Sequence, residues 1–293
     1  MSDRGTIYDL HVHTNCSDGG KSPGEVVRLA IENGLNTIAI TDHYTLAGID
    51  YAKEIAGKDL NIIPGIEISA QCPKGKRLHI VGLFVNKSIY SLVDYYETKR
   101  KVLINETIVK LRANNYRIKM NDVVTYCRDR SSIGRYDIAI TLASMHYASN
   151  AKQAYEEILM SRKIFIEREK LSAEEVIDSI IKAGGIPILA HPNSFGCGSI
   201  PVFEERLEKL KEFGLVGMEV YTPYISESKR EELLKLCEKY ELLPSVGSDF
   251  HRIRPELPLI GLGIDNNMCI TDPYILRNLK KEKNRIHKHN TSE

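Results

Sequence analysis

Short apolar runs alternate with helix-like segments along most of this chain, and this alternation limits the possible folds more than any other feature. One helical segment begins at Ser22-Pro23, where an N-cap serine precedes a proline at the first helical position. Another begins at Ser172, where Glu175 completes a capping-box pattern. We expect strands at residues 6–10, 36–40, 60–69, 77–85, 186–190, 216–220 and 243–247. Repeated βα units predict an α/β fold, with a parallel sheet or barrel covered by helices.

The alternation is interrupted between residues 91 and 160, where tyrosine, asparagine and charged residues are frequent and no strand is apparent. This composition is typical of consecutive helices. A chain of 293 residues suits one large domain that contains an insertion. We therefore predict a catalytic barrel domain formed by residues 1–88 and 165–293, and a helical insertion, acting as a substrate cap, at residues 89–164.

Histidines and acidic residues gather at the ends of the predicted strands. His11 and His13 follow the first strand two residues apart, so both point to the same side of an extended segment. The other members follow or line further strands, or lie in an adjacent loop: Asp18, His43, Glu67, His79, His191, Asp249 and His251. Because ligands bind where the carboxyl ends of strands meet, we expect these nine donors to converge on one pocket.

The chemistry of the nine donors indicates a class of metal. Six imidazoles and three carboxylates suit Zn²⁺, Mn²⁺ or iron, and they argue against calcium or a structural cysteine–zinc site. Nine donors exceed the needs of one ion, so we expect two or three divalent ions, with Glu67 as the shared carboxylate. Such a cluster activates water and neutralises the attacking and leaving oxygens of a phosphoester. The predicted reaction is therefore phosphoester hydrolysis.

The same residues resemble the motifs of a known family. The motifs are Asp9-Leu10-His11-Val12-His13-Thr14, Ile40-Thr41-Asp42-His43, Pro64-Gly65-Ile66-Glu67-Ile68-Ser69, His79-Ile80-Val81-Gly82, Ala190-His191-Pro192 and Gly247-Ser248-Asp249-Phe250-His251. In this order, spread over nearly the whole chain, they resemble those of the PHP (polymerase and histidinol phosphatase) superfamily of metal-dependent phosphoesterases. The resemblance implies a distorted (β/α)7 barrel with a trinuclear metal site.

By this resemblance, each of the nine donors has a place in the metal site. One ion would be held by His11, His13, Glu67 and Asp249. A second ion would share Glu67 and add His79 and His191, and a third would take Asp18, His43 and His251. All nine positions are filled, unlike those of the family's degenerate members. For protonation of the leaving oxygen we expect His251 or Asp18 to act.

The helical insertion resembles that of the branch that removes phosphate from AMP or from nucleoside 3′,5′-bisphosphates. The similarity lies in Ser132-Ile133-Gly134-Arg135 and Gln153-Ala154-Tyr155. It implies that Arg135 binds substrate phosphate through its guanidinium fork, with a helix-capping surface arginine as the structural alternative. Two positions depart from this branch. Tyr136-Asp137 replaces Pro-His, which bears on phosphate recognition, and Tyr44 replaces aspartate, which bears on the surroundings of His43.

The balance of charge and the ends of the chain limit the expected partners. With 40 basic and 39 acidic side chains, the net charge of +1 provides no overall field for duplex DNA. The basic run at residues 277–289 is typical of a solvated helix end, with contact to short single-stranded RNA as the alternative. A polar start, no apolar run of ~18 residues and six scattered cysteines predict a cytoplasmic protein without a membrane partner.

These observations predict a metal-dependent phosphoesterase that hydrolyses a phosphomonoester of a small substrate, a nucleotide such as AMP or a nucleoside 3′,5′-bisphosphate. Three alternatives stay open: a 5′→3′ exonuclease on short oligonucleotides, a histidinol-phosphate-type phosphatase, and a metal-binding interaction module without turnover. Glu219 and Tyr221 end a further predicted strand, where they either line the site or pack in the core.

Overall fold

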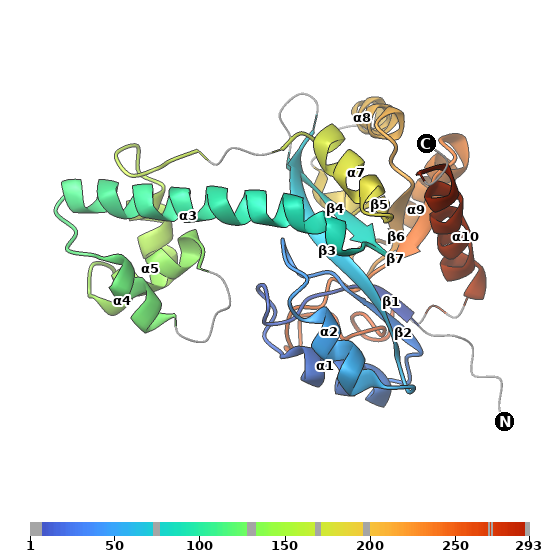
Figure 1. Cartoon of the computed structure of the whole chain (residues 1–293), viewed down its shortest axis with the longest axis horizontal. Helices are drawn as coiled ribbons and strands as arrows, with labels where there is room; N and C mark the ends of the chain where they lie inside the picture. Colours follow the sequence, from blue (N-terminus) through green and yellow to red (C-terminus); the bar gives the residue numbers. More distant parts are fainter. Residues whose placement is uncertain are drawn as a thin grey trace. The chain divides into compact units, whose positions relative to one another are not determined.

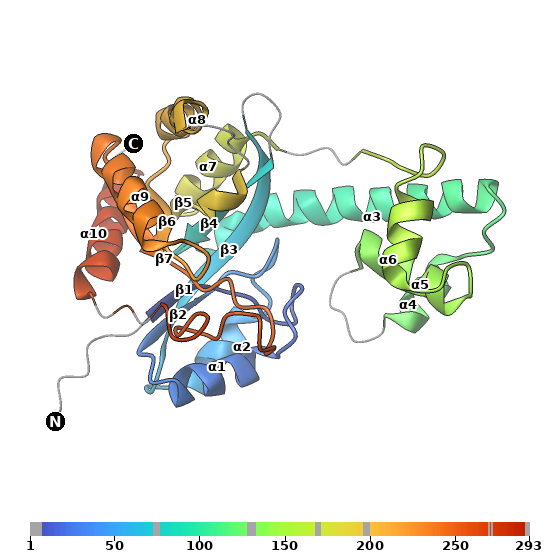
Figure 2. The same cartoon turned by 180° about the vertical axis from the view of Figure 1, so that it is seen from behind.

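A computed structural model of the chain describes residues 8–72, 77–127, 133–167, 171–195, 200–268, 270 and 272–290. The chain divides into two compact units, Met1–Tyr90 with Lys170–Glu293 and, between them in sequence, Ser91–Glu169. Figures 1 and 2 show the sheet of the first unit and the helices of the second from opposite sides. Each unit has a hydrophobic core of its own.

The first unit is built on one seven-stranded sheet whose strands follow their sequence order. They are β1 (Tyr8–Val12), β2 (Thr37–Ile40), β3 (Asn61–Gln71), β4 (Arg77–Leu83), β5 (Ile186–Leu189), β6 (Gly217–Tyr221) and β7 (Leu243–Val246). The segment after β7 returns to β1, because Asp249 N donates to His11 O (3.0 Å) and His13 N donates to Phe250 O (2.9 Å). These bonds curl the sheet toward closure at one end, and the predicted α/β barrel-like fold is confirmed.

The strand β4 runs against its neighbours, so the prediction of a parallel sheet is wrong at this position. It pairs antiparallel with both β3 and β5, whereas the other neighbouring pairs are parallel. The reason is the short connection of residues 72–76 between β3 and β4. A parallel pair needs a crossover of a dozen or more residues, but an antiparallel pair can be joined by a short loop.

Helices cover the outside of this sheet. They are α1 (Pro23–Glu32), α2 (Ile49–Ala56), α7 (Ala173–Lys182), α8 (Ile200–Glu212), α9 (Glu227–Lys239) and α10 (Pro273–Asn290), with short 3₁₀ turns η2 (Lys87–Ile89) and η4 (Pro192–Phe195). The predicted N-cap at Ser22 and the predicted capping box of Ser172 with Glu175 at α7 are confirmed, and Ser22 also forms a capping box with Glu25 at α1. In Figure 1 the blue helices α1 and α2 lie beside β1 and β2, while α7, α9 and α10 lie around β4 to β7.

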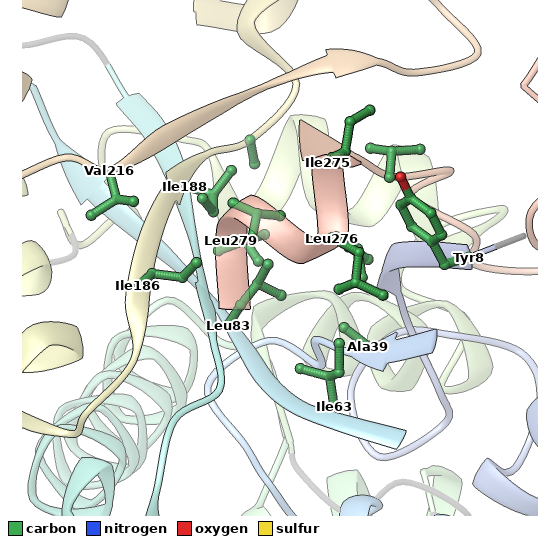
Figure 3. Close-up of a cluster of buried hydrophobic side chains, with 14 of the residues drawn as sticks. Tyr8, Ala39, Ile63, Leu83, Ile186, Ile188, Val216, Ile275, Leu276 and Leu279 are labelled. Carbon is green, nitrogen blue, oxygen red and sulfur yellow. The ribbon is translucent and has the colours of Figure 1, made fainter. Parts of the chain in front are cut away.

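The core of the first unit joins the sheet to the C-terminal helix. Ile275, Leu276 and Leu279 of α10 pack among apolar side chains of the strands, including Leu83 and Ile188. Figure 3 shows these side chains gathered around α10, with Tyr8 at one border. The basic run predicted as a helix end therefore belongs to a helix whose apolar side is buried, and its Arg277, Lys280 and Lys281 are exposed.

The second unit is helical. It contains most of α3 (Tyr90–Ala113), followed by α4 (Met120–Tyr126), α5 (Arg135–Ser144), α6 (Ala151–Gln153) and the π-helical turn η3 (Ala154–Leu159). Its core includes Ile108 and Leu111 of α3, Ile138 and Leu142 of α5, and Leu159 of η3. None of its described residues forms a strand. Across the parts of the chain that the structure describes, no helix has the length and apolar character needed to cross a membrane.

Candidate metal centre

All nine predicted donors lie in the first unit, at the end of the sheet where β1 meets the segment after β7. The strand β1 ends at Val12, whereas we predicted an end at residue 10. His11 therefore lies within the strand, and only His13 follows it. Thr6 and Ile7, with which we began this strand, lie outside the described residues. The two imidazoles are fully buried, and their Nε2 atoms are 3.1 Å apart.

Glu67 is the centre of the cluster. It was predicted at the end of the third strand, but it lies in the middle of β3, because β3 continues past β2 in antiparallel pairing with β4. The carboxylate is almost completely buried. Five imidazole nitrogens surround it: His79 Nδ1 at 2.8 Å, His191 Nε2 at 3.0 Å, His13 Nε2 at 3.1 Å, and His11 Nε2 and His43 Nδ1 at 3.3 Å.

The donor atoms form three overlapping groups, each within 4.8 Å. The groups are His11, His13, Glu67 and Asp249; His43, Glu67 and His79; and His13, Asp18, His43 and His251. His191 adjoins the second group through Glu67. Compared with the sets implied by the family resemblance, His13 and His43 each belong to two groups. The cluster is thus more continuous than the implied sets, in which only Glu67 is shared.

Two ring nitrogens in the cluster have no hydrogen bond of acceptable geometry among the described residues. They are Nδ1 of His13 and Nδ1 of His43, and both atoms are buried. Burying a polar nitrogen without a partner is unfavourable, and the great majority of such groups in proteins are satisfied. Imidazole nitrogens and carboxylate oxygens are the ligands of zinc, manganese and iron. The residues present therefore fit a cluster of divalent cations.

The electrostatics of the cluster follow from this crowding. Burial alone raises the pKa of Glu67 and Asp249, but the neighbouring imidazoles outweigh it and hold both pKa values well below their ordinary range. Burial lowers the pKa of His43 to about 4, which leaves this imidazole neutral. For His13, Asp249 and Glu67 outweigh burial and raise the pKa to about 10. A cation held by His13 would have to displace this proton.

Asp42 and Asp9 support the cluster from behind, and the sequence reasoning did not select them. Asp42 Oδ1 accepts from Thr14 N (2.7 Å) and Ser17 Oγ (2.6 Å), which fixes the loop that contains Asp18. Asp9 accepts from the backbone N–H of Ser248 (2.9 Å) and fixes the segment that contains Asp249. Both are buried. The available signal was an acidic residue inside or directly after an apolar strand.

The backbone around the cluster is strained. His191, Asp249 and Tyr44 have positive φ angles of 28°, 56° and 55°. Non-glycine residues rarely adopt this conformation, and such strain is concentrated at functional sites. Tyr44, which departs from the branch pattern, links two loops of the site: its hydroxyl accepts from Ser69 N (3.1 Å), and its ring stacks beside His43.

Arg135 lies in the second unit, at the first position of α5. Its Nη2 donates to Ile166 O (2.5 Å), and its guanidinium lies over the Phe165 ring, 5.2 Å from the centroid. The Asp137 carboxylate accepts from Gly134 N (2.7 Å), so the Tyr136-Asp137 departure provides the cap of this helix. The contacts of Arg135 are with the segment at Phe165 and Ile166 rather than with the helix cap, and its phosphate-binding role stays a prediction. Ser132 lies outside the described residues.

Comparison with known proteins relates this geometry to a family. Residues 9–185 match the PHP domain. A 5′-3′ exoribonuclease of Haemophilus influenzae is 33% identical over 277 residues, which cover 92% of this chain and 96% of that relative. A 3′,5′-nucleoside bisphosphate phosphatase of Chromobacterium violaceum is 24% identical over 248 residues, which cover 83% of this chain and 86% of the phosphatase. Among solved structures, a protein assigned as a metal-dependent phosphoesterase from Bifidobacterium adolescentis has a TM-score of 0.71 at 26% identity, over 94% of this chain and 95% of that one.

Proposed function

The chain belongs to the PHP family of metal-dependent phosphoesterases, and we propose that within this family it is a 5′→3′ exonuclease that acts on short RNA. The observation that carries the proposal is the buried Glu67 carboxylate, which has five imidazole nitrogens within 3.3 Å. Such a site suits metal-assisted hydrolysis of a phosphoester. The similarity to the Haemophilus exoribonuclease, which spans nearly the full length of both chains, favours RNA as the substrate.

We assign the nine clustered donors as ligands of two or three divalent ions of zinc, manganese or iron. When bound, such ions polarise a phosphoryl oxygen and activate water at neutral pH. The protein supplies an asymmetric setting for them: His11 and His13 are fully buried, whereas half of the Asp18 side chain is exposed. Because Asp18 is the most exposed of the nine side chains, we propose that the substrate reaches the cluster from its side.

The two candidates for protonating the leaving oxygen differ in their contacts. Burial raises the pKa of Asp18, but His251, His43 and His13 outweigh it and hold this pKa below its ordinary range. A carboxylate that stays ionised cannot donate a proton. The His251 ring donates from Nδ1 to the Asp249 carbonyl (2.8 Å), which directs Nε2 toward Asp18, 3.3 Å away. We therefore favour His251 Nε2, which can donate a proton or ligate an ion but cannot do both at once.

A second candidate function is removal of phosphate from a nucleoside 3′,5′-bisphosphate. The Chromobacterium phosphatase and the similarity of the helical insertion favour it. Both reactions hydrolyse a phosphoester at one metal cluster. The exonuclease reaction separates a nucleotide from the remaining RNA chain, whereas the phosphatase reaction separates phosphate from a nucleotide. For either substrate we propose that Arg135 in the helical unit contributes to phosphate binding, using guanidinium donors other than the one bonded to Ile166.

One assay separates the two functions. The purified protein with added Mn²⁺ is incubated with a 5′-phosphorylated pentanucleotide RNA labelled at its 3′ end, and in parallel with a nucleoside 3′,5′-bisphosphate. An exonuclease gives 3′-labelled products that shorten one nucleotide at a time. Phosphate release from the bisphosphate with intact RNA would select the phosphatase. The Glu67→Gln variant, purified in the same way, controls for contaminating nucleases, and hydrolysis of neither substrate would contradict both assignments.

A further inference from the structure

Glu219 lies behind the donor cluster and contacts two of its histidines, which come from different strands. Its side chain is nearly fully buried on β6. We propose that Glu219 is a positioning residue that orients His11 and His191 together, and so couples two parts of the metal centre. This inference rests on the proposed function, because it assigns a role toward the ions that the cluster would hold.

The first contact fixes the ring of His11. Glu219 Oε1 lies 2.6 Å from His11 Nδ1. A carboxylate accepts, so this short contact assigns the proton to Nδ1 and leaves the Nε2 lone pair for another partner. That Nε2 atom faces the cluster, 3.3 Å from both Glu67 Oε2 and Asp249 Oδ1. Carboxylates that hold the second nitrogen of a metal-binding histidine set its tautomer and its orientation in this way.

The second contact fixes the backbone at His191. The other oxygen, Glu219 Oε2, accepts from the His191 backbone N–H at 2.5 Å. His191 has a φ angle of 28°, which is an unfavourable conformation for a residue with a side chain. A strong acceptor at its N–H therefore stabilises a backbone that places Nε2 3.0 Å from Glu67 Oε1. One carboxylate thus holds both His11, a member of one donor group, and His191, which adjoins another group through Glu67.

The chain around Glu219 is shaped to bring the carboxylate to this position. The pairing of β6 with β7 shifts register between Glu219 and Tyr221, and the pairing of β1 with β2 shifts between Asp9 and Val12, on either side of His11. Such bulges redirect side chains. Gly247 lies against His11 and Glu219, because a Cβ at this position would overlap His11 Cβ and lie 2.8 Å from Glu219 Oε1. The absence of a side chain at position 247 leaves room for the contact.

The geometry predicts that position 219 needs two acceptor oxygens at the full length of a glutamate side chain, and that a negative charge alone cannot orient His11 and His191. In Glu219→Gln one side-chain oxygen remains, but the amide NH₂ faces a donor where an acceptor is needed. In Glu219→Asp both oxygens and the charge remain, but the side chain is one methylene shorter and cannot satisfy both partners from the same backbone. A suitable control is Asp137→Asn, which alters an equally buried carboxylate that caps α5 in the helical unit.

The test measures Zn²⁺ binding rather than turnover. Metal-free protein, Glu219→Gln, Glu219→Asp and Asp137→Asn are each titrated with Zn²⁺ in competition with a chromophoric chelator, after circular dichroism has established that each metal-free protein is folded. We expect both Glu219 variants to bind Zn²⁺ about 10–100-fold more weakly than the parent, the range typical of partners behind the ligands. Asp137→Asn should stay within about threefold of the parent, since it lies outside the centre.

Four results would contradict the account in different ways. Parent-like affinity of both Glu219 variants, or full rescue by Glu219→Asp, would overturn the positioning role. A parent protein that binds no Zn²⁺ or Mn²⁺ would instead overturn the proposed function. If the variants do not fold, ¹⁵N spectra of the histidine rings in the unmutated protein decide the question. His11 should keep its proton on Nδ1 while Zn²⁺ shifts the Nε2 signal, and loss of the Nδ1 proton on Zn²⁺ binding would overturn the inference.

Discussion

The two ends of the sheet in the first unit differ in almost every physical respect. At one end the interior is apolar, and Leu279 of α10 packs among Ile186 and Ile188. At the other end buried imidazoles and carboxylates crowd around Glu67, two ring nitrogens have no hydrogen bond of acceptable geometry among the described residues, and His191 and Asp249 have strained backbones. The apolar end stabilises the fold by burial, whereas the polar end carries the cost of burying polar groups that lack hydrogen-bond partners.

This difference indicates how one sheet can serve both stability and chemistry. The strands pass from one environment into the other: in β1, Leu10 belongs to the apolar core and His11 to the donor cluster. Function and stability are therefore expected to respond to different substitutions, although the residues are neighbours in sequence. Four substitutions test this separation.

The largest effect is expected for Glu67→Gln. This substitution removes the shared negative charge of the centre, and the loss of several kcal/mol of transition-state stabilisation corresponds to at least ~10³-fold in kcat/KM. The metal-free variant should remain folded, because the apolar core around α10 is unchanged. Kinetics with the preferred substrate and circular dichroism of the metal-free protein measure the two effects. Near-parental turnover of this variant would contradict the assignment of Glu67 to the metal centre.

Leu279→Ala should have the opposite profile. Leu279 is fully buried in the core around α10. Truncation of such a leucine costs about 2–5 kcal/mol of unfolding free energy, because the transfer free energy of the removed atoms is lost and a cavity is left. Denaturant unfolding of the metal-free protein measures this loss. Zn²⁺ affinity of the folded variant should match that of the parent. A drop in affinity as large as the loss of stability would show that the two ends of the sheet are not separable.

Tyr44→Phe should have a smaller effect, because it removes the hydrogen bond between the Tyr44 hydroxyl and Ser69 N and leaves the metal ligands in place. The hydroxyl accepts from Ser69 N, so its loss leaves a donor of β3 without this partner, at a cost of about 1 kcal/mol in unfolding free energy. The stacking of the ring on His43 is retained. Thermal unfolding with and without Zn²⁺ measures the change. An unchanged melting temperature in both conditions would show that the Tyr44–Ser69 link contributes nothing.

The smallest effect concerns pH and lies away from the centre. Hydrogen bonds from Ser22, with a further contribution from Lys21, lower the pKa of Glu25 from 4.5 to about 2. Because the folded pKa is lowered, this contribution to stability is present above pH 4.5 and is lost as the pH falls toward 2. The difference in melting temperature between the parent and Glu25→Gln should shrink over this range. A difference that does not vary with pH would contradict the lowered pKa.

The sequence predicts the fold well wherever a signal is local. Capping patterns at Ser22 and Ser172 define helix starts, and apolar runs define the strands. The direction of β4 was missed because an apolar run contains no information about strand polarity. The short connection after β3 was the usable clue, since residues 72–76 cannot contain a crossover helix. The same error displaced Glu67 from the end of its strand to the middle.

The candidate site is predictable in its membership but not in its connections. Histidines and acids at successive strand ends must approach one another once the strands are neighbours, so the nine donors could be named in advance. Which donors share a group depends on rotamers and on bulges near His11 and Glu219, which leave little trace in sequence. Glu219 in particular resembles any acid on a strand until its two partners, His11 and the His191 backbone, are known.

The most direct test of the central claim is anomalous X-ray diffraction from crystals of catalytically active protein, with data collected at the zinc, iron and manganese edges. The account predicts two or three anomalous peaks inside the cluster, each bordered by one of the groups that surround Glu67. An active protein whose anomalous peaks all lie outside this cluster, or that shows none at all, would contradict the assignment of these nine residues as a metal centre.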